Sequence, residues 1–174
     1  GVAGGSGGKK QGGRATGAGV GGVKITPCEG VLAGDKTGAK KGNPGVTVLS
    51  GYSQDFIEQA KCKTVAQNQI SSGSQVEFNV AGPCGLGTLD AAKQAGIWGI
   101  GVDTDQAFLG PHLPTSAVKR VDNGIYLTFK CASARTVQAR KYLVYVLSNG
   151  GIGRGKMTHQ VPKTSLQPLD DTTL

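Results

Sequence analysis

No run of apolar residues in this sequence approaches the length of about eighteen that a membrane-spanning helix needs. Aromatic residues are also scarce, at 5% of the chain, and no charged-then-apolar leader opens the sequence at Gly1. Any signal peptide is therefore expected to have been removed or to lie outside the sequence. The 174 residues are enough for one domain with its own core, or for one lobe of a larger protein.

Cysteines are few and far apart in the sequence: Cys28, Cys62, Cys84 and Cys131. They form no CxxC pair and no Cys/His spacing typical of zinc, so we expect neither a metal site nor a cofactor. The even count permits two disulfides, although scattered cysteines are more often small buried apolar residues. The cysteines therefore leave the cellular compartment open.

Acidic residues are absent from one long stretch and almost absent from another. Residues 1–19 contain none, and from Lys119 to Lys163 nine basic residues accompany a single acid, Asp122. The chain has a formal charge of +8 and a pI near 9.5, a balance that suggests nucleic acid or a membrane surface as a partner. The basic residues are spread out, however, and few aromatics lie among them to stack on bases. We therefore expect no nucleic-acid partner.

Glycine is abundant, with 30 residues, and it dominates residues 1–19, which we expect to be a flexible basic linker. From Gly21 onward, apolar strand-like runs alternate with helical patterns. A first short strand is expected to end at Val23 and Ile25. Further strands are expected at 46–49, 76–80, 97–102, 115–119 and 142–147. Expected helices span 27–41, 55–71, 87–95 and 120–132, and the tail from Pro162 is expected to be loose. Such apolar strands favour an α/β fold whose parallel sheet is covered on both faces.

Ligands of open parallel sheets bind beyond the carboxyl ends of the strands, and three such ends here carry polar or glycine-rich residues. The first leads into Phe56. The second leads into the turn from Gly82 to Gly87, which either cradles a phosphate with backbone N–H groups or simply packs a helix on the sheet. It lacks the Lys-Ser/Thr pair of a P-loop.

The third strand end carries Asp103 and Asp105. These carboxylates could act as an acid/base pair, hold a metal, accept hydrogen bonds from sugar hydroxyls or cap a helix. Lys119 follows the next strand-like run and is either a donor to a ligand near Asp103 or an exposed lysine at a helix start. His112 and His159 are expected to be surface residues rather than bases, and no G-x-S-x-G elbow occurs. Enzymatic activity is therefore not expected.

The run LGTLDAAKQAGIWGIGVDTDQAFLGPHLPTSAVKRVD, residues 86–122, carries a family resemblance. It closely resembles the basic membrane protein (BMP) family of substrate-binding lipoproteins, whose members carry a VAGGxGxG turn followed by AAKxxGxxxIGVDxDQ and TSxxKxVD segments. Residues 46–63 resemble that family's YxxSFxDxAKGK segment, and residues 147–153 resemble its NGGVG motif. The resemblance covers about residues 20–160.

The resemblance implies a type I periplasmic-binding-protein fold, in which two α/β lobes close on a ligand. Residues 1–19 would then be a linker or a remnant of the first lobe, and 20–112 the second lobe. Residues 113–136 would be a hinge strand and a helix that packs on the first lobe. Residues 137–174 would return to the second lobe and end in the tail. By this resemblance, most of the first lobe would be absent from the sequence.

The resemblance also implies a function. It predicts an extracytoplasmic, lipid-anchored protein that binds purine or related nucleosides for an ABC transporter permease, with the anchor outside this chain. Phe56 would stack on the base, Gly82 would supply a backbone contact, and Asp103, or less favourably Asp105, would accept from the ribose with Lys119 as donor. The alternatives are the same fold binding a sugar or another small metabolite, and the sensor domain of a DNA-binding regulator.

Several positions depart from the family pattern. Cys62 stands at the glycine of AKGK, and Pro83 stands at the second glycine of VAGG. Val31 replaces an aromatic residue at a helix start, and Pro114 replaces an apolar residue before Thr115. A single lobe cannot enclose a ligand as two lobes do, so binding is expected to need the other lobe as well.

Overall fold

The computed structural model describes residues 15–136, 146–155 and 157, and its centre is one six-stranded sheet. The strands are β1 (Thr16–Gly21), β2 (Thr47–Tyr52), β3 (Val76–Val80), β4 (Trp98–Asp103), β5 (Thr115–Lys119) and β6 (Ile152–Arg154). Their order in the sheet is β2-β1-β3-β4-β5-β6. The first five run parallel, and β6 pairs antiparallel with β5.

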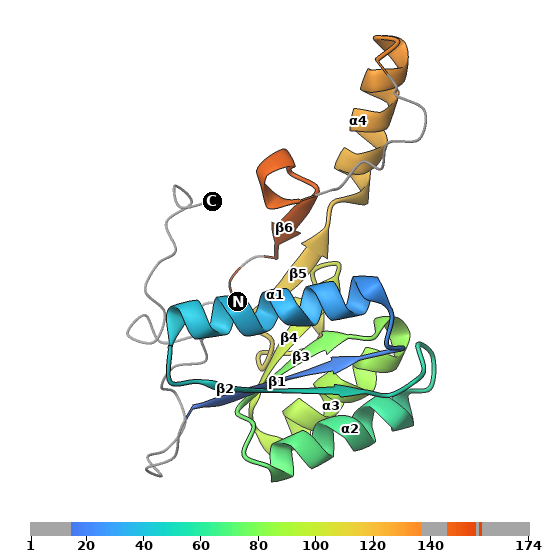
Figure 1. The fold of residues 1–174 in the computed structure, drawn as a ribbon. Coiled ribbons are helices and arrows are strands. Elements are labelled where there is room, and N and C mark those ends of the chain that lie inside the picture. The colour runs from blue at the N-terminus through green and yellow to red at the C-terminus, as the bar shows by residue number, and fades with distance from the viewer. Residues whose placement is uncertain (1–14, 137–145, 156, 158–174) are drawn as a thin grey trace.

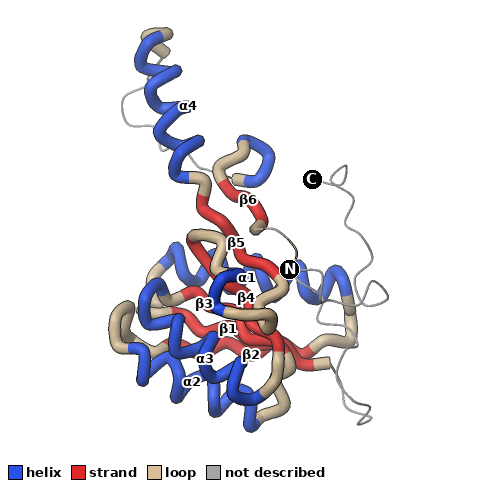
Figure 2. The backbone as a smooth tube through the Cα atoms, turned by 180° about the vertical axis from the view of Figure 1, so that it is seen from behind, coloured by secondary structure: helices blue, strands red, loops and turns tan. Residues whose placement is uncertain are grey.

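Helices cover both faces of this sheet (Figures 1 and 2). Helix α1 (Thr26–Gly42) lies on one face, and α2 (Gln59–Ser71) and α3 (Leu86–Ala95) lie together on the other. Two apolar clusters fill the spaces between the layers. The α1 side holds Leu32, Val76, Phe78, Val80, Ile100 and Val102, and the opposite side holds Val20, Cys62, Ala66, Ala81, Cys84 and Ala91. The expected α/β class with three layers is confirmed.

Strand β1 lies where no strand was expected. It begins at Thr16, inside the range 1–19 expected to be a linker or lobe remnant, and it lies between β2 and β3 in the sheet. A Cβ at Gly19 would come within 2.5 Å of Leu32 Cδ2, so small residues let α1 approach this strand closely. The glycine content that suggests a linker therefore serves packing here, and the strand expected at Val23 and Ile25 is wrong, because residues 22–25 connect β1 to α1.

Helix α2 begins at Gln59 rather than at the expected residue 55. The carboxylate of Asp55 explains the delay, because its Oδ1 accepts hydrogen bonds from the backbone N–H groups of Ile57 (2.8 Å) and Glu58 (3.0 Å). These bonds hold the preceding residues in a turn. Phe56 consequently lies in a loop and not on the apolar side of the helix.

The other predicted elements agree with the structure to within a few residues. Gly96, at φ +67°, ends α3 as expected, and α4 spans Val121–Ser133. The expected strand 142–147 lies largely outside the described residues, and Leu147 itself begins a short 3₁₀ helix, η3 (Leu147–Asn149). His159 and the tail from Pro162 also lie outside them.

Two of the four cysteines form a disulfide, Cys62–Cys84, with a Cα–Cα distance of 5.7 Å. Our preference for buried free cysteines is therefore wrong for this pair. It holds for Cys28, which is free and buried, whereas Cys131 is free and only partly buried. Periodicity along the chain could not reveal the pairing, because α2 and the turn after β3 meet only in the folded sheet.

Helix α4 points away from the sheet (Figure 1). Four of its large apolar side chains are between 54% and 69% exposed: Val121, Ile125, Tyr126 and Phe129. Among the described residues, no helix combines the length and the apolar character required to span a bilayer. The assignment of residues 113–136 to a hinge and a lobe-packing helix remains a prediction, and the exposed apolar side of α4 is compatible with it.

Candidate ligand-binding site

The carboxyl ends of β1, β2 and β3 meet at one edge of the sheet. The strand register places Gly21 beside both Tyr52 and Val80. Backbone hydrogen bonds extend this pairing into the loops, since Gly22 N–H donates to Val80 O and Gln54 N–H donates to Gly22 O. The loops after β2 and β3 are therefore held side by side.

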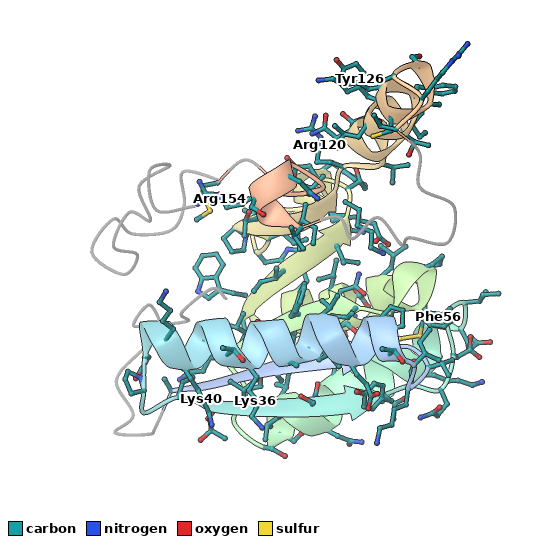
Figure 3. All side chains as sticks on the ribbon, turned by 45° about the horizontal axis from the view of Figure 1, so that its top comes forward. Lys36, Lys40, Phe56, Arg120, Tyr126 and Arg154 are labelled. Atoms are coloured by element: carbon teal, nitrogen blue, oxygen red, sulfur yellow. A yellow bond between two sulfur atoms is a disulfide. The ribbon has the colours of Figure 1, made fainter. Side chains whose placement is uncertain are left out.

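Phe56 lies in the loop after β2, at the end of the sheet where α1 begins (Figure 3). Its ring packs on Gly22, where an added Cβ would lie 2.4 Å from the ring atom Cδ1. Its carbonyl oxygen accepts a hydrogen bond from Cys84 N–H at 2.9 Å. The side chain is 36% exposed, so part of its surface remains open to an incoming group.

Gly82 follows β3 and begins the short 3₁₀ helix η1 (Gly82–Gly85). Its φ of +55° is one that residues with a Cβ adopt reluctantly, and a Cβ there would point to within 3.8 Å of Phe56 O. The turn thus brings Gly82 close to Phe56, while their assignment as ligand contacts remains a prediction. The turn forms η1 and leads directly into α3, which packs on the sheet. Packing a helix on the sheet is one of the two roles that the sequence allowed for this turn.

Asp103 and Lys119 end the neighbouring strands β4 and β5. The register pairs Asp103 with Val118, and Lys119 Nζ lies 2.5 Å from Asp103 Oδ1. Both side chains are substantially exposed, at 44% for Asp103 and 62% for Lys119. The predicted donor and acceptor therefore form an ion pair at the open edge of the sheet.

Asp105 has a different environment. Its Oδ1 accepts a hydrogen bond from Ala107 N–H at 3.2 Å, and a Cβ added at Gly155 would lie 3.1 Å from its carboxylate. This hydrogen bond holds the turn before the short 3₁₀ helix η2 (Ala107–Leu109), and the ligand-binding assignment of Asp105 remains a prediction. The ion pair with Lys119 is made by Asp103.

Two further polar residues, which sequence reasoning missed, hold the Asp103 loop in place. Gln106 is buried, and its Oε1 accepts from Val102 N–H at 2.9 Å. Its own N–H donates to Ser116 Oγ at 3.0 Å, which ties the loop to β5. The glutamine at the end of the GVDTDQ segment could have pointed to this role. Its side chain accepts a hydrogen bond from the backbone and so holds the loop.

The candidate residues thus form two pairs, Phe56 with Gly82 and Asp103 with Lys119. Within these pairs, Gly82 follows β3 and Asp103 ends β4, and these two strands are neighbours in the sheet. His112 is partly buried instead of a surface residue, and burial lowers the pKa of its imidazole. Within the described residues, no group of three or more His, Cys, Asp or Glu side chains could hold a metal ion.

Asp55 places a permanently ionised carboxylate next to Phe56 in the sequence. Lys61 Nζ lies 2.7 Å from Asp55 Oδ2, and this bond, with the two backbone N–H donors, holds the pKa of Asp55 well below its usual value. The carboxylate is therefore ionised at any physiological pH and keeps the turn before α2 formed. Its role is to position the loop that carries Phe56.

Comparison with known proteins gives the family. The model of the family described as "Bmp: ABC transporter substrate-binding protein PnrA-like" matches residues 7–170. The chain belongs to this Bmp family. Basic membrane protein D of Borreliella burgdorferi (strain JD1) is 35% identical to the chain over 138 residues, which make up 77% of this chain and 40% of that relative. The Bmp chain therefore spans well under half of that relative's length.

Solved structures support the same conclusion. An ABC transporter solute-binding protein of Aeropyrum pernix K1 has a TM-score of 0.66 and 27% identity, covering 82% of this chain and 41% of that one. A protein described as a transcriptional activator of the comK gene, from Bacillus halodurans, has a TM-score of 0.75 at 22% identity, covering 86% and 51%. The latter likeness shows the fold alone. The periplasmic-binding-protein type of fold is confirmed, and a family of substrate-binding proteins agrees with the expected lack of enzymatic activity.

Proposed function

We propose that this Bmp chain is the second lobe of an extracytoplasmic protein that binds a purine or related nucleoside and delivers it to an ABC transporter permease. The observation that carries the proposal is the ion pair of Asp103 and Lys119 at the open edge of the sheet. It supplies an acceptor and a cationic donor at the end of the sheet where the partly exposed ring of Phe56 also lies, and these are the groups that a ribose and a base require.

Each side chain has a distinct role in this proposal. The open part of the Phe56 ring stacks on the base, while Gly22 supports its other side. The ribose hydroxyls donate to Asp103, and Lys119 donates to a ligand oxygen while remaining close to the carboxylate. Gly82 brings backbone close to the ligand, because no side chain intervenes.

The remaining contacts would come from the other lobe. This edge of the sheet is only one wall of a cleft, and ligand that bridges two lobes would favour their closed arrangement. The permease would recognise that arrangement. We place the protein at the outer face of the membrane, held by a lipid anchor outside residues 1–174.

Calorimetric titration of the full-length protein with adenosine, guanosine and inosine tests the ligand class. We expect heat with at least one nucleoside and none with D-ribose or the free base alone, because stacking and ribose contacts are both required. Heat with no nucleoside would refute the ligand assignment. Mass spectrometry of a co-purified ligand would then identify a sugar or another metabolite, the main alternative.

A sensor domain of a DNA-binding regulator is the other alternative. It predicts a mobility shift with duplex DNA that weakens as salt is raised, because phosphate contacts release counterions. We expect no such shift at physiological salt.

A further inference from the structure

The disulfide lies directly behind the loops that carry Phe56 and Gly82. Cys62 is in the first turn of α2, and Cys84 is in η1, two residues after Gly82. Both sulfur-bearing side chains are completely buried. The covalent link therefore joins the element that follows Phe56 to the element that begins with Gly82 (Figure 3).

Non-covalent contacts connect both loops to this link. Cys84 N–H donates to Phe56 O at 2.9 Å, so the backbone of the stacking residue is bonded to one half-cystine. On the other side of the link, the start of α2 packs against the start of α3, where a Cβ at Gly87 would lie 2.0 Å from Gln59 O. Movement of α2 relative to η1 would consequently move Phe56 relative to Gly82.

Two departures from the family pattern concentrate here. Cys62 stands where the pattern has the glycine of AKGK, and Pro83 stands at the second glycine of VAGG. A disulfide removes conformations from a chain, and proline fixes the backbone angle φ at a position where glycine would be free. Both changes restrict the same turn, whereas a requirement for overall stability alone would not favour this place over any other.

We propose that the Cys62–Cys84 disulfide preorganises Phe56 and Gly82 for ligand, so that full affinity requires the oxidised protein. This inference rests on the proposed function, in which those two residues contact the ligand. A site held in its bound geometry loses less conformational freedom on binding, and the reduced protein would lose that advantage. Disulfides persist outside the cytoplasm, which agrees with the location of ABC substrate-binding proteins.

The test compares the full-length protein with and without the link. A trialkylphosphine breaks the S–S bond, and with one water molecule it yields two thiols and the phosphine oxide. Because both sulfur atoms are buried, the variant Cys62→Ala with Cys84→Ala is measured alongside. The control variant, Cys28→Ala with Cys131→Ala, removes the two free cysteines and keeps the disulfide.

Two readouts are taken at a temperature where circular dichroism shows every sample folded. The first is hydrogen exchange at the amides of Ile57, Glu58 and Cys84. We expect loss of the disulfide to speed their exchange about tenfold or more, without change at β4 or α1 amides. The second is calorimetric affinity for the nucleoside that binds the oxidised protein most tightly, with Kd expected to rise about tenfold. The control variant should match the wild type in both.

The outcomes separate this inference from the proposed function. Equal acceleration across the whole sheet, or an unchanged Kd in folded protein without the disulfide, would overturn the inference. If no nucleoside binds even the oxidised protein, the proposed function fails. The exchange pattern alone then tests whether the disulfide holds the loops of Phe56 and Gly82 in place. Acceleration confined to residues 56–58 and 82–85 would support it, and uniform or absent acceleration would refute it.

Discussion

The ammonium nitrogen of Lys119 lies 2.5 Å from Oδ1 of Asp103, across the ends of two neighbouring parallel strands. The residues are sixteen positions apart in the sequence, and the register of β4 with β5 brings them together. Both charges remain accessible to solvent, so a ligand can approach either of them. An exposed ion pair adds little to stability, which favours a role in binding.

Asp103→Asn and Lys119→Met should each weaken ligand binding about tenfold or more, because each removes a charge-assisted hydrogen bond. The free energy of unfolding should change by less than about 1 kcal/mol, since the pair is solvent-screened. Calorimetric titration and urea unfolding of the full-length protein measure the two quantities.

Asp90→Asn provides the matched control for these variants. It breaks the ion pair of Lys63 and Asp90, which joins α2 to α3 with a spacing of 2.7 Å and lies on helices rather than at the strand ends. We expect a similarly small stability change and unaltered affinity. An equal loss of affinity in this control would contradict the special role of Asp103 and Lys119.

Glu77 should make stability depend on pH. It is fully buried on β3, and this burial raises the pKa of its carboxyl to about 7 from 4.5. The protonated form is favoured in the folded protein, so the stabilising contribution is complete below pH 4.5 and is lost as pH rises towards 7. The total loss corresponds to about 3 kcal/mol.

Urea unfolding of the wild type and Glu77→Gln at several pH values between 4.5 and 8 checks this. The wild type should lose stability relative to the variant across that interval, with no further divergence above it. Parallel pH curves for the two proteins would show that Glu77 does not titrate in the folded state as proposed. The difference between the curves isolates Glu77 from other titrating groups.

Two helical glycines should respond oppositely to alanine. A Cβ at Gly87 would lie 2.0 Å from Gln59 O, a backbone atom, whereas a Cβ at Gly34 would meet nothing within 4 Å. Gly87→Ala should therefore cost about 2 kcal/mol or more by forcing α3 away from α2. Gly34→Ala should stabilise α1 by about 1 kcal/mol through its better helix propensity. Urea unfolding measures both, and a neutral Gly87→Ala would refute the close packing.

The apolar side of α4 should drive self-association of the 174-residue chain when no other lobe covers it. Sedimentation velocity should show mass rising with concentration, and Ile125→Lys with Phe129→Lys should abolish the rise. Ile57→Lys with Phe108→Lys is the control, because those side chains are each 78% exposed elsewhere on the molecule. A wild-type chain that stays monomeric at all concentrations would argue against an uncovered packing face.

Patterns confined to neighbouring residues predicted much of the fold. The apolar runs of β3 and β4, bounded by glycines, and the helix ended by Gly96 agree closely with the structure. The predictions that are wrong concern β1 and the start of α2, where contacts specific to the folded chain outweigh the local sequence pattern. In β1, glycines usual in linkers accommodate α1, and at Asp55 a carboxylate bond to two N–H groups delays the start of α2.

The sequence by itself determined the family and the identity of the candidate residues, because those rest on the order of short motifs along the chain. Only the tertiary structure decided their partners. It paired Asp103 with Lys119, assigned Asp105 to its own turn, and joined Cys62 to Cys84. Strand register and helix packing bring these groups together from distant positions, and no local periodicity encodes the distances between them.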